Sequence, residues 1–72
     1  MKRTEVVAEV AGKVWKLEAQ PGAQLAADQV ILILESMKME IPVAAPRACR
    51  LAALHVKEGE MIEEGRVVAT IE

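Results

Sequence analysis

Residues 30–45 read VILILESMKMEIPVAA, an apolar segment on either side of a short stretch that contains one lysine. The strand-like segments Val30–Glu35 and Glu40–Ala45, separated by so few residues, predict a β-hairpin. Its tip is Ser36–Met39, and the central residues Met37 and Lys38 are expected to take positive φ, as a tight hairpin turn requires. Non-glycine residues adopt this backbone at a cost, and such strain is typical of positions that serve function.

The chain reads as an internal duplication with an offset of 37 residues. The halves Ala11–Glu35 and Ala48–Glu72 both follow the order strand, glycine turn, short apolar pairing, turn and strand. The alignment superposes Leu17 on Leu54, Gly22 on Gly59, Val30 on Val67, Leu34 on Ile71 and Glu35 on Glu72. Position 38 minus the offset is residue 1, so the lysine hairpin in one half corresponds to the chain break in the other. If a pseudo-twofold axis relates the halves, both termini lie at the end opposite Lys38.

Strand patterns recur along the chain at short and regular intervals. The expected strands are Thr4–Val10, Gly12–Ala19, Val30–Glu35, Glu40–Ala45, Arg50–Val56 and Val67–Ile71, with very short pairings near Gln24–Leu25 and Met61–Ile62. Leu51–Leu54 alone could be helical, but its counterpart Val14–Leu17 alternates, so both are predicted to be strands. Such spacing predicts an all-β sandwich or small barrel.

The repeat also indicates which face of the central apolar run lies in the core. Val30, Leu32 and Leu34 are the better core candidates, because their counterparts in the second half are all apolar. The opposite face is shared by Ile31, Ile33 and the charged Glu35.

Composition excludes several classes of protein. Seventy-two residues predict one domain, and a net charge of −2 argues against a nucleic-acid partner. The single Cys49 cannot form an intrachain disulfide, which favours a reducing compartment. The longest apolar run is too short to span a membrane, and no signal-peptide pattern precedes the first strand. We therefore expect a cytoplasmic protein without a membrane partner.

The hexapeptide Glu35-Ser36-Met37-Lys38-Met39-Glu40, placed between two strands, resembles the attachment site of the biotinyl/lipoyl attachment domain family. Gly12-Lys13-Val14-Trp15-Lys16 resembles the family's first-strand pattern, and Pro21-Gly22 and Glu58-Gly59-Glu60 match its paired turns. The resemblance covers nearly the whole chain. It is closest to free-standing biotin carboxyl carriers that lack the extra thumb loop.

The resemblance implies a fold and a function. The fold is a flattened β-barrel or sandwich of two four-stranded antiparallel sheets with an internal pseudo-twofold repeat, and residues 1–72 form a single biotinyl-type carrier domain. Lys38 is the covalent attachment point of biotin, Met37 and Met39 flank it for recognition by a biotin protein ligase, and Ser36 and Glu35 support the tip. The chain is then no enzyme itself. It carries a carboxyl group between biotin carboxylase and carboxyltransferase subunits, and an acyl-CoA carboxylase is the expected type.

Two other functions remain open from the sequence. A lipoyl carrier, with lipoate on Lys38, shares the fold and the hairpin, although lipoyl domains usually have Asp-Lys-Ala at the tip. Met37 and Met39 therefore favour biotin. The second alternative is an unmodified assembly module of the same fold.

Two positions depart from the family pattern. Ala48-Cys49 stands where a glycine usually precedes the strand, and Asp28 stands where a turn glycine is common, although its counterpart Gly65 is retained. Neither position adjoins Lys38 in the sequence, so these departures bear on local turn geometry.

The remaining polar or unusual residues have structural interpretations. Cys49 is expected to be a buried small side chain, His55 a surface strand residue and Trp15 a packing residue at a sheet edge. One His and one Cys cannot form a structural zinc site. The acidic cluster Glu58, Glu60, Glu63 and Glu64 is expected to be a solvated edge, with an electrostatic docking patch as the alternative.

Overall fold

The computed structural model describes residues 3–72, and its regular structure consists of eight strands. The strands are β1 (Thr4–Val7), β2 (Gly12–Leu17), β3 (Gln24–Leu25), β4 (Val30–Ser36), β5 (Met39–Ala44), β6 (Cys49–Leu54), β7 (Met61–Ile62) and β8 (Val67–Ile71). All eight lie where the sequence predicted strands, including β6, whose Leu51–Leu54 segment is extended. Across residues 3–72 there is no helix long and apolar enough to cross a membrane.

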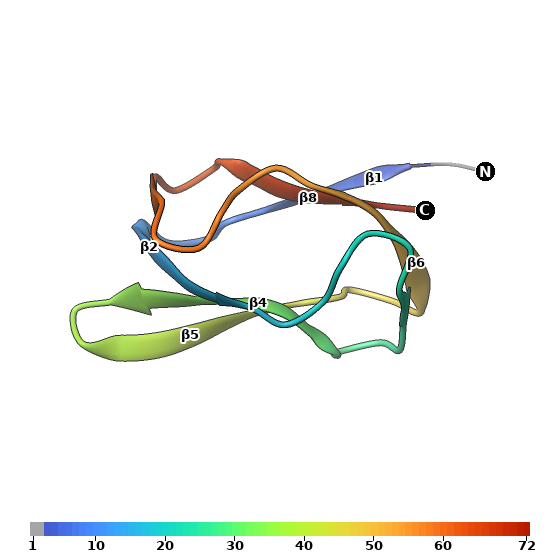
Figure 1. Cartoon of the computed structure of the whole chain (residues 1–72), viewed down its shortest axis with the longest axis horizontal. Coiled ribbons are helices and arrows are strands. Elements are labelled where there is room, and N and C mark those ends of the chain that lie inside the picture. The colour runs from blue at the N-terminus through green and yellow to red at the C-terminus, as the bar shows by residue number, and fades with distance from the viewer. Residues whose placement is uncertain (1–2) are drawn as a thin grey trace.

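The strands form two four-stranded antiparallel sheets that pack face to face (Figure 1). One sheet has the order β1-β8-β6-β3 and the other the order β5-β4-β2-β7. The predicted flattened sandwich of two four-stranded sheets is therefore confirmed. The strand β4 is internal to its sheet and pairs with β5 on one side and β2 on the other.

The internal repeat is present in the hydrogen-bonding pattern as well as in the sequence. Adding the offset of 37 to β2, β3 and β4 gives β6, β7 and β8, and adding it to β1 gives β5. The irregularities repeat too. The β2–β4 register shifts between Val14 and Lys16, and the β6–β8 register shifts at the equivalent positions, between Leu51 and Ala53. The two sheets are thus copies of one another, which supports the inferred pseudo-twofold relation.

The core lies between the sheets and is built from Val, Ile, Leu, Ala and Cys side chains. Its fully buried larger members are Val14, Ile31, Leu32, Leu34, Leu51, Val68 and Ile71. Small and β-branched side chains suit a thin sandwich core, because the two inner faces must interdigitate across a narrow gap. Within the described residues no polar or charged side chain is buried.

The predicted orientation of β4 is correct at Leu32 and Leu34 and wrong at Val30 and Ile31. Ile31 is fully buried, whereas Val30 is only partly buried. The reason is a register shift between Val30 and Leu32 in the pairing with β5. At this irregularity strict alternation fails, so that two consecutive side chains face inward. The equivalent pair in β8, Val68 and Ala69, is also fully buried.

Two further expectations need correction. Strand β1 ends at Val7 rather than Val10, because its partner β8 begins at Val67, opposite Val7. Trp15 lies on β2 beyond Gly12 and Lys13, the two residues that pair with β7, and it is 48% exposed, so it is a half-exposed side chain and not a packing residue. It lies within the register shift between Val14 and Lys16, where the ladder with β4 is interrupted.

The turns take the geometry that their glycines predicted. Gly22 and Gly59 occupy equivalent turns with φ of 96° and 90°. Asp28 and Gly65 are likewise equivalent, with φ of 69° and 89°. Aspartate is among the few non-glycine residues that tolerate this region, so the departure at Asp28 preserves the turn.

The lysine hairpin and the end of the chain lie at opposite ends of the molecule, whose longest extent is 36 Å (Figure 1). The β4–β5 hairpin forms one end, and Glu72 lies at the other, where its backbone pairs with that of Arg50. The predicted position of the C-terminus is therefore confirmed. Met1 lies outside the described residues.

The burial of Ile31 gives a test of the register shift that uses two isoleucines on one strand. Ile31→Val should lower the free energy of unfolding by about 0.5–1.5 kcal/mol, because it removes a fully buried methylene. Ile33→Val should cost clearly less, since Ile33 is half-buried. Urea titration of both variants measures the difference. Equal costs, or a larger cost at Ile33, would contradict the observed orientation of β4.

Candidate functional site

The hairpin at one end of the molecule is a two-residue loop between β4 and β5. Ser36 pairs with Met39 as its last rung, and Glu35 pairs with Glu40 before it. Met37 and Lys38 fill the loop with φ of 52° and 66°. Two consecutive positive φ values are the signature of a type I′ turn, whose twist matches that of paired strands. The predicted turn at Met37 and Lys38 and its positive φ values are confirmed, while each strand runs one residue closer to the loop than predicted, to Ser36 and from Met39.

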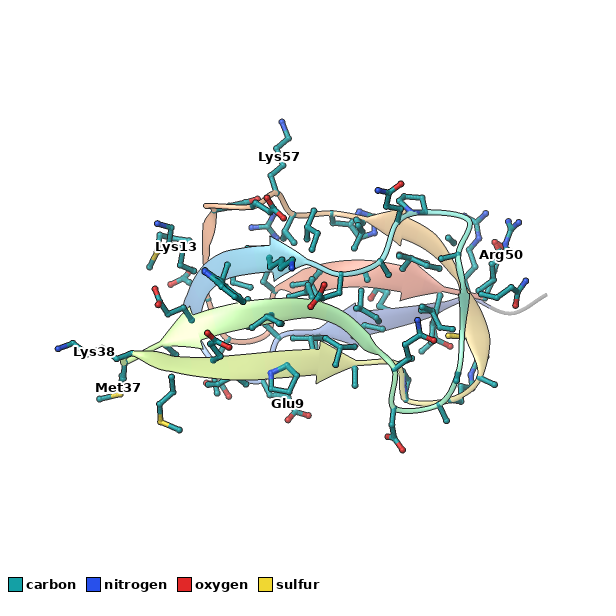
Figure 2. All side chains as sticks on the ribbon, turned by 60° about the horizontal axis from the view of Figure 1, so that its bottom comes forward. Glu9, Lys13, Met37, Lys38, Arg50 and Lys57 are labelled. Carbon is teal, nitrogen blue, oxygen red and sulfur yellow. The ribbon has the colours of Figure 1, made fainter. Side chains whose placement is uncertain are left out.

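The side chains of the loop point into solvent. Met37 is 92% exposed and Met39 is 65% exposed. Figure 2 shows Lys38 and Met37 projecting from the extreme end of the hairpin, away from both sheets. Among the hydrogen bonds and ion pairs of residues 3–72, none involves the Lys38 amine. The amine is free to be reached from outside the molecule.

The base of the hairpin is fixed by its neighbours. Leu34, four residues before the lysine, is fully buried and pairs with Val14 of β2 and with Ile41 of β5. The next residue, Glu35, pairs with Lys13 on one side and Glu40 on the other. The strand that leads to Lys38 is therefore held on both edges as far as Glu35, one rung below the loop.

The other lysines of the described chain occupy different settings. Lys13 lies within the paired part of β2, and Lys16 lies 3.9 Å from Glu18 in an exposed ion pair. Lys57 projects from a loop on the upper side of the molecule in Figure 2. Only Lys38 among these four stands on a two-residue turn with positive φ. An enzyme that recognises the shape of the hairpin can therefore select this lysine by geometry.

Two acidic side chains lie beside the tip. Glu35 and Glu40 form the rung before the last one and are exposed. No group of three or more His, Cys, Asp or Glu side chains within residues 3–72 is placed to hold a metal ion.

The other polar candidates from the sequence have structural settings. Cys49 is a buried free thiol at the start of β6. His55 is exposed, just beyond the end of β6, and its Nε2 lies 2.8 Å from the Thr70 hydroxyl oxygen. It is a surface residue as expected, although it lies outside the strand.

The acidic cluster around the second glycine turn is partly built into the fold. Glu58 accepts a hydrogen bond of 3.0 Å from the Leu17 amide. Glu60 accepts one of 3.1 Å from the Lys57 amide and forms an ion pair of 3.1 Å with Arg66. These two carboxylates stabilise the turn. The sequence predicted only a solvated acidic edge, so this structural role is an addition to that prediction.

Met61 is an exposed apolar residue that the sequence analysis did not select. It is 70% exposed, and β7 places it opposite Lys13, in the same cross-sheet row as Glu35 and Glu40. The repeat could have identified it, because its counterpart Gln24 is polar and therefore marks the position as outward-facing. Met61 is therefore an exposed methionine on the flank of the sheet, with the charged Lys13, Glu35 and Glu40 beside it in the row.

An all-β sandwich that presents one exposed lysine on a type I′ hairpin is the arrangement of a small carrier domain. Residues 4–71 match the Biotin_lipoyl family model, which is described as "Biotin-requiring enzyme". The chain belongs to this biotin/lipoyl attachment family, as its resemblance predicted.

Similar proteins and a similar solved structure agree with this family assignment. The chain is 42% identical over 60 residues to the biotin/lipoyl attachment protein of Bacillus subtilis, covering 83% of this chain and 82% of that protein. It is 37% identical over 67 residues to a biotinylated protein, the TB7.3 homolog of Mycobacterium leprae, covering 93% and 94% of the two chains. The Kluyveromyces lactis urea carboxylase structure superposes with a TM-score of 0.94 at 30% identity, covering all of this chain but only 6% of that one.

The exposure of the two tip methionines predicts a small contribution to stability. Met37→Ala and Met39→Ala should each cost well below about 2 kcal/mol, because the truncated atoms are already in water. Leu34→Ala, on the same hairpin but fully buried, should cost about 2–5 kcal/mol. Thermal unfolding of the three variants compares them. A loss at Met37 or Met39 as large as that at Leu34 would show that the tip packs as core.

Proposed function

We propose that this chain is a biotin carboxyl carrier and that biotin is joined by an amide bond to Nζ of Lys38. The observation that carries the proposal is the exposed, unpaired amine on a type I′ turn between two exposed methionines. A carrier lysine must project, must be distinguishable from other lysines and must leave its attached group free to move. Lys38 meets these requirements, whereas the strand lysine Lys13 does not.

The attachment step uses the geometry of the tip. A biotin protein ligase offers biotin as an acyl-adenylate, and the neutral Nζ of Lys38 attacks its carbonyl carbon. The amide C–N bond forms, AMP leaves, and the amine proton passes to a base of the ligase. Met37 and Met39 provide apolar surface beside the nucleophile, and Ser36 and Glu35 hold the last rungs of the hairpin.

When attached, biotin supplies the carboxyl-carrying chemistry, and this chain supplies position. The buried end of β4 anchors the arm, and the exposed Lys38 side chain adds reach. Tethering confines the carried group near two active sites and raises its effective concentration at each. Bond-making belongs to a biotin carboxylase and to a carboxyltransferase, so this chain acts as a carrier or subunit and not as the catalyst.

The carboxyl acceptor, the assembly and the cellular location are the finer parts of this proposal. The similar structure is a urea carboxylase, and this chain spans 6% of its length, so the carboxyl acceptor is a separate question. We propose that the assembly is an acyl-CoA carboxylase and that residues 1–72 form a single carrier domain. We also propose a cytoplasmic location, because the lone Cys49 favours a reducing compartment.

A lipoyl carrier is the second candidate function, and one observation favours keeping it. The similar Bacillus subtilis protein is named for both biotin and lipoyl attachment. Incubating the chain with lipoate, ATP and a lipoate ligase, alongside the biotin reaction, separates the two by the mass added to Lys38. No observation favours an unmodified assembly module, since the lysine hairpin is complete.

The proposal predicts that Lys38 alone accepts biotin. Incubation with biotin, ATP and a biotin protein ligase should raise the intact mass by one biotinyl group. Lys38→Arg retains the positive charge and removes the nucleophile, so the mass should stay unchanged while circular dichroism shows the same fold. Lys13→Arg is the matched control and should be labelled like the wild-type chain. Biotin on the Lys38→Arg variant would refute the assignment.

The opposite placement of tip and C-terminus predicts how the domain tolerates added mass. A folded protein fused after Glu72 should leave the rate of biotinylation nearly unchanged, because Glu72 lies at the far end (Figure 1). A short insertion between Glu35 and Ser36 should abolish labelling, since it breaks the last two rungs below the turn. If the fusion blocks the ligase as completely as the insertion, recognition depends on the far end of the domain.

A further inference from the structure

Gly12 differs from the other three glycines of the chain. Gly22, Gly59 and Gly65 have positive φ, and a Cβ built on any of them would meet nothing within 4 Å. Gly12 is buried at the start of β2 and is not among the positive-φ residues. A Cβ at Gly12 would lie 2.8 Å from the carbonyl oxygen of Glu35 and 3.4 Å from Cβ of Ser36. Position 12 therefore requires glycine because the backbone of Glu35 lies so close to it, and not because of a turn with positive φ.

The contact falls on the base of the lysine hairpin. Glu35 and Ser36 form its last two rungs and immediately precede the Met37-Lys38 loop. The atom that comes closest belongs to the backbone of β4, so it cannot rotate away as a flexible side chain could. A side chain at Gly12 therefore requires a shift between the start of β2 and the end of β4, the strand that leads into the loop.

The internal repeat shows that the strand itself does not need a glycine here. The counterpart of Gly12 is Cys49, which begins β6 and is also buried. Their pairings are equivalent, because Gly12 pairs with Ile62 and Cys49 with Leu25. Yet position 49 holds a side chain.

The neighbours of the two positions differ. The counterpart of Glu35 is Glu72, whose backbone pairs with that of Arg50, the residue after Cys49. The same place in the fold therefore holds a thiol next to the Arg50–Glu72 pair and a glycine against Glu35 and Ser36, the base of the lysine hairpin. Since the sandwich accommodates a side chain at position 49, the need for glycine at position 12 points to the hairpin base.

We propose that Gly12 is a positioning residue for Lys38, whose absent side chain lets the hairpin base lie against β2 and so sets the direction of the tip. This inference rests on the proposed function, because the position of the tip matters only if a partner must reach the amine. A misplacement of about 1 Å at a reacting group can cost about a hundredfold in rate. A side chain at Gly12 should therefore slow attachment more than it weakens the fold.

The test compares Gly12→Ala with Gly22→Ala. Gly22 has φ of 96° and open space around it, so its alanine variant is destabilised by backbone strain alone. Its amide donates to the Leu51 carbonyl of the other sheet, away from the hairpin. For both variants we would measure the unfolding midpoint, kcat/KM for biotinylation by the ligase, and the amide chemical shifts of Ser36–Met39. We expect Gly12→Ala to lower kcat/KM about tenfold or more and to shift these amides, and Gly22→Ala to lower the midpoint only.

The outcomes separate the inference from the proposed function. If the wild-type chain accepts no biotin, the proposed function fails, but displaced Ser36–Met39 amides in Gly12→Ala still support the positioning role. If Gly12→Ala is labelled like wild type, or if both variants lose rate in proportion to stability, the positioning role is overturned. Should Gly12→Ala fail to fold, trimethylamine N-oxide, which favours compact states, is added to both variants. A chain that remains unfolded there, while Gly22→Ala folds, shows that the whole sandwich needs Gly12 and also overturns the inference.

Discussion

Strand β4 is paired on both edges and buried on its inner face, and the position of the lysine depends on this. Ile31, Leu32 and Leu34 are fully buried, while β5 and β2 hold the two edges. A slip by one residue would turn these side chains toward water and break both ladders at once. Only three residues separate Leu34 from Lys38, so the tip takes its position directly from the core.

The hairpin tip presents Lys38 through its backbone conformation and its exposure to solvent. The tip combines a strained backbone at Met37 and Lys38 with side chains that lie almost wholly in water. The backbone conformation of the turn sets the direction in which the Lys38 side chain leaves the hairpin. The exposed Met37 and Met39 offer apolar area beside it without filling the core. These properties suit a domain that carries a group on an exposed lysine.

The duplication explains the architecture, and the places where the halves differ indicate where function acts. Register shifts and turn conformations repeat from one half to the other, because both sheets bury equivalent side chains against each other. Asp28 replaces the equivalent of Gly65 in a turn that aspartate tolerates, which leaves the fold unchanged. The difference between Gly12 and Cys49 has another origin, since Gly12 lies against Glu35 and Ser36 at the base of the lysine hairpin. A symmetric scaffold has become asymmetric at the end that carries the lysine.

The sequence by itself determined the all-β class, the repeat, the strand positions and the lysine turn. Those features rest on local patterns: the alternation of apolar and polar residues, the glycine turns, and the tight loop between Ser36 and Met39. These patterns can be identified without knowledge of the tertiary packing. Tertiary structure alone decided that Ile31 is buried, that Trp15 is exposed and that Gly12 lies against Glu35. Each depends on the register in which two strands pair, β4 with β5 for Ile31 and β2 with β4 for Trp15 and Gly12. A register shift of one residue changes which face a side chain occupies, and no local pattern records it.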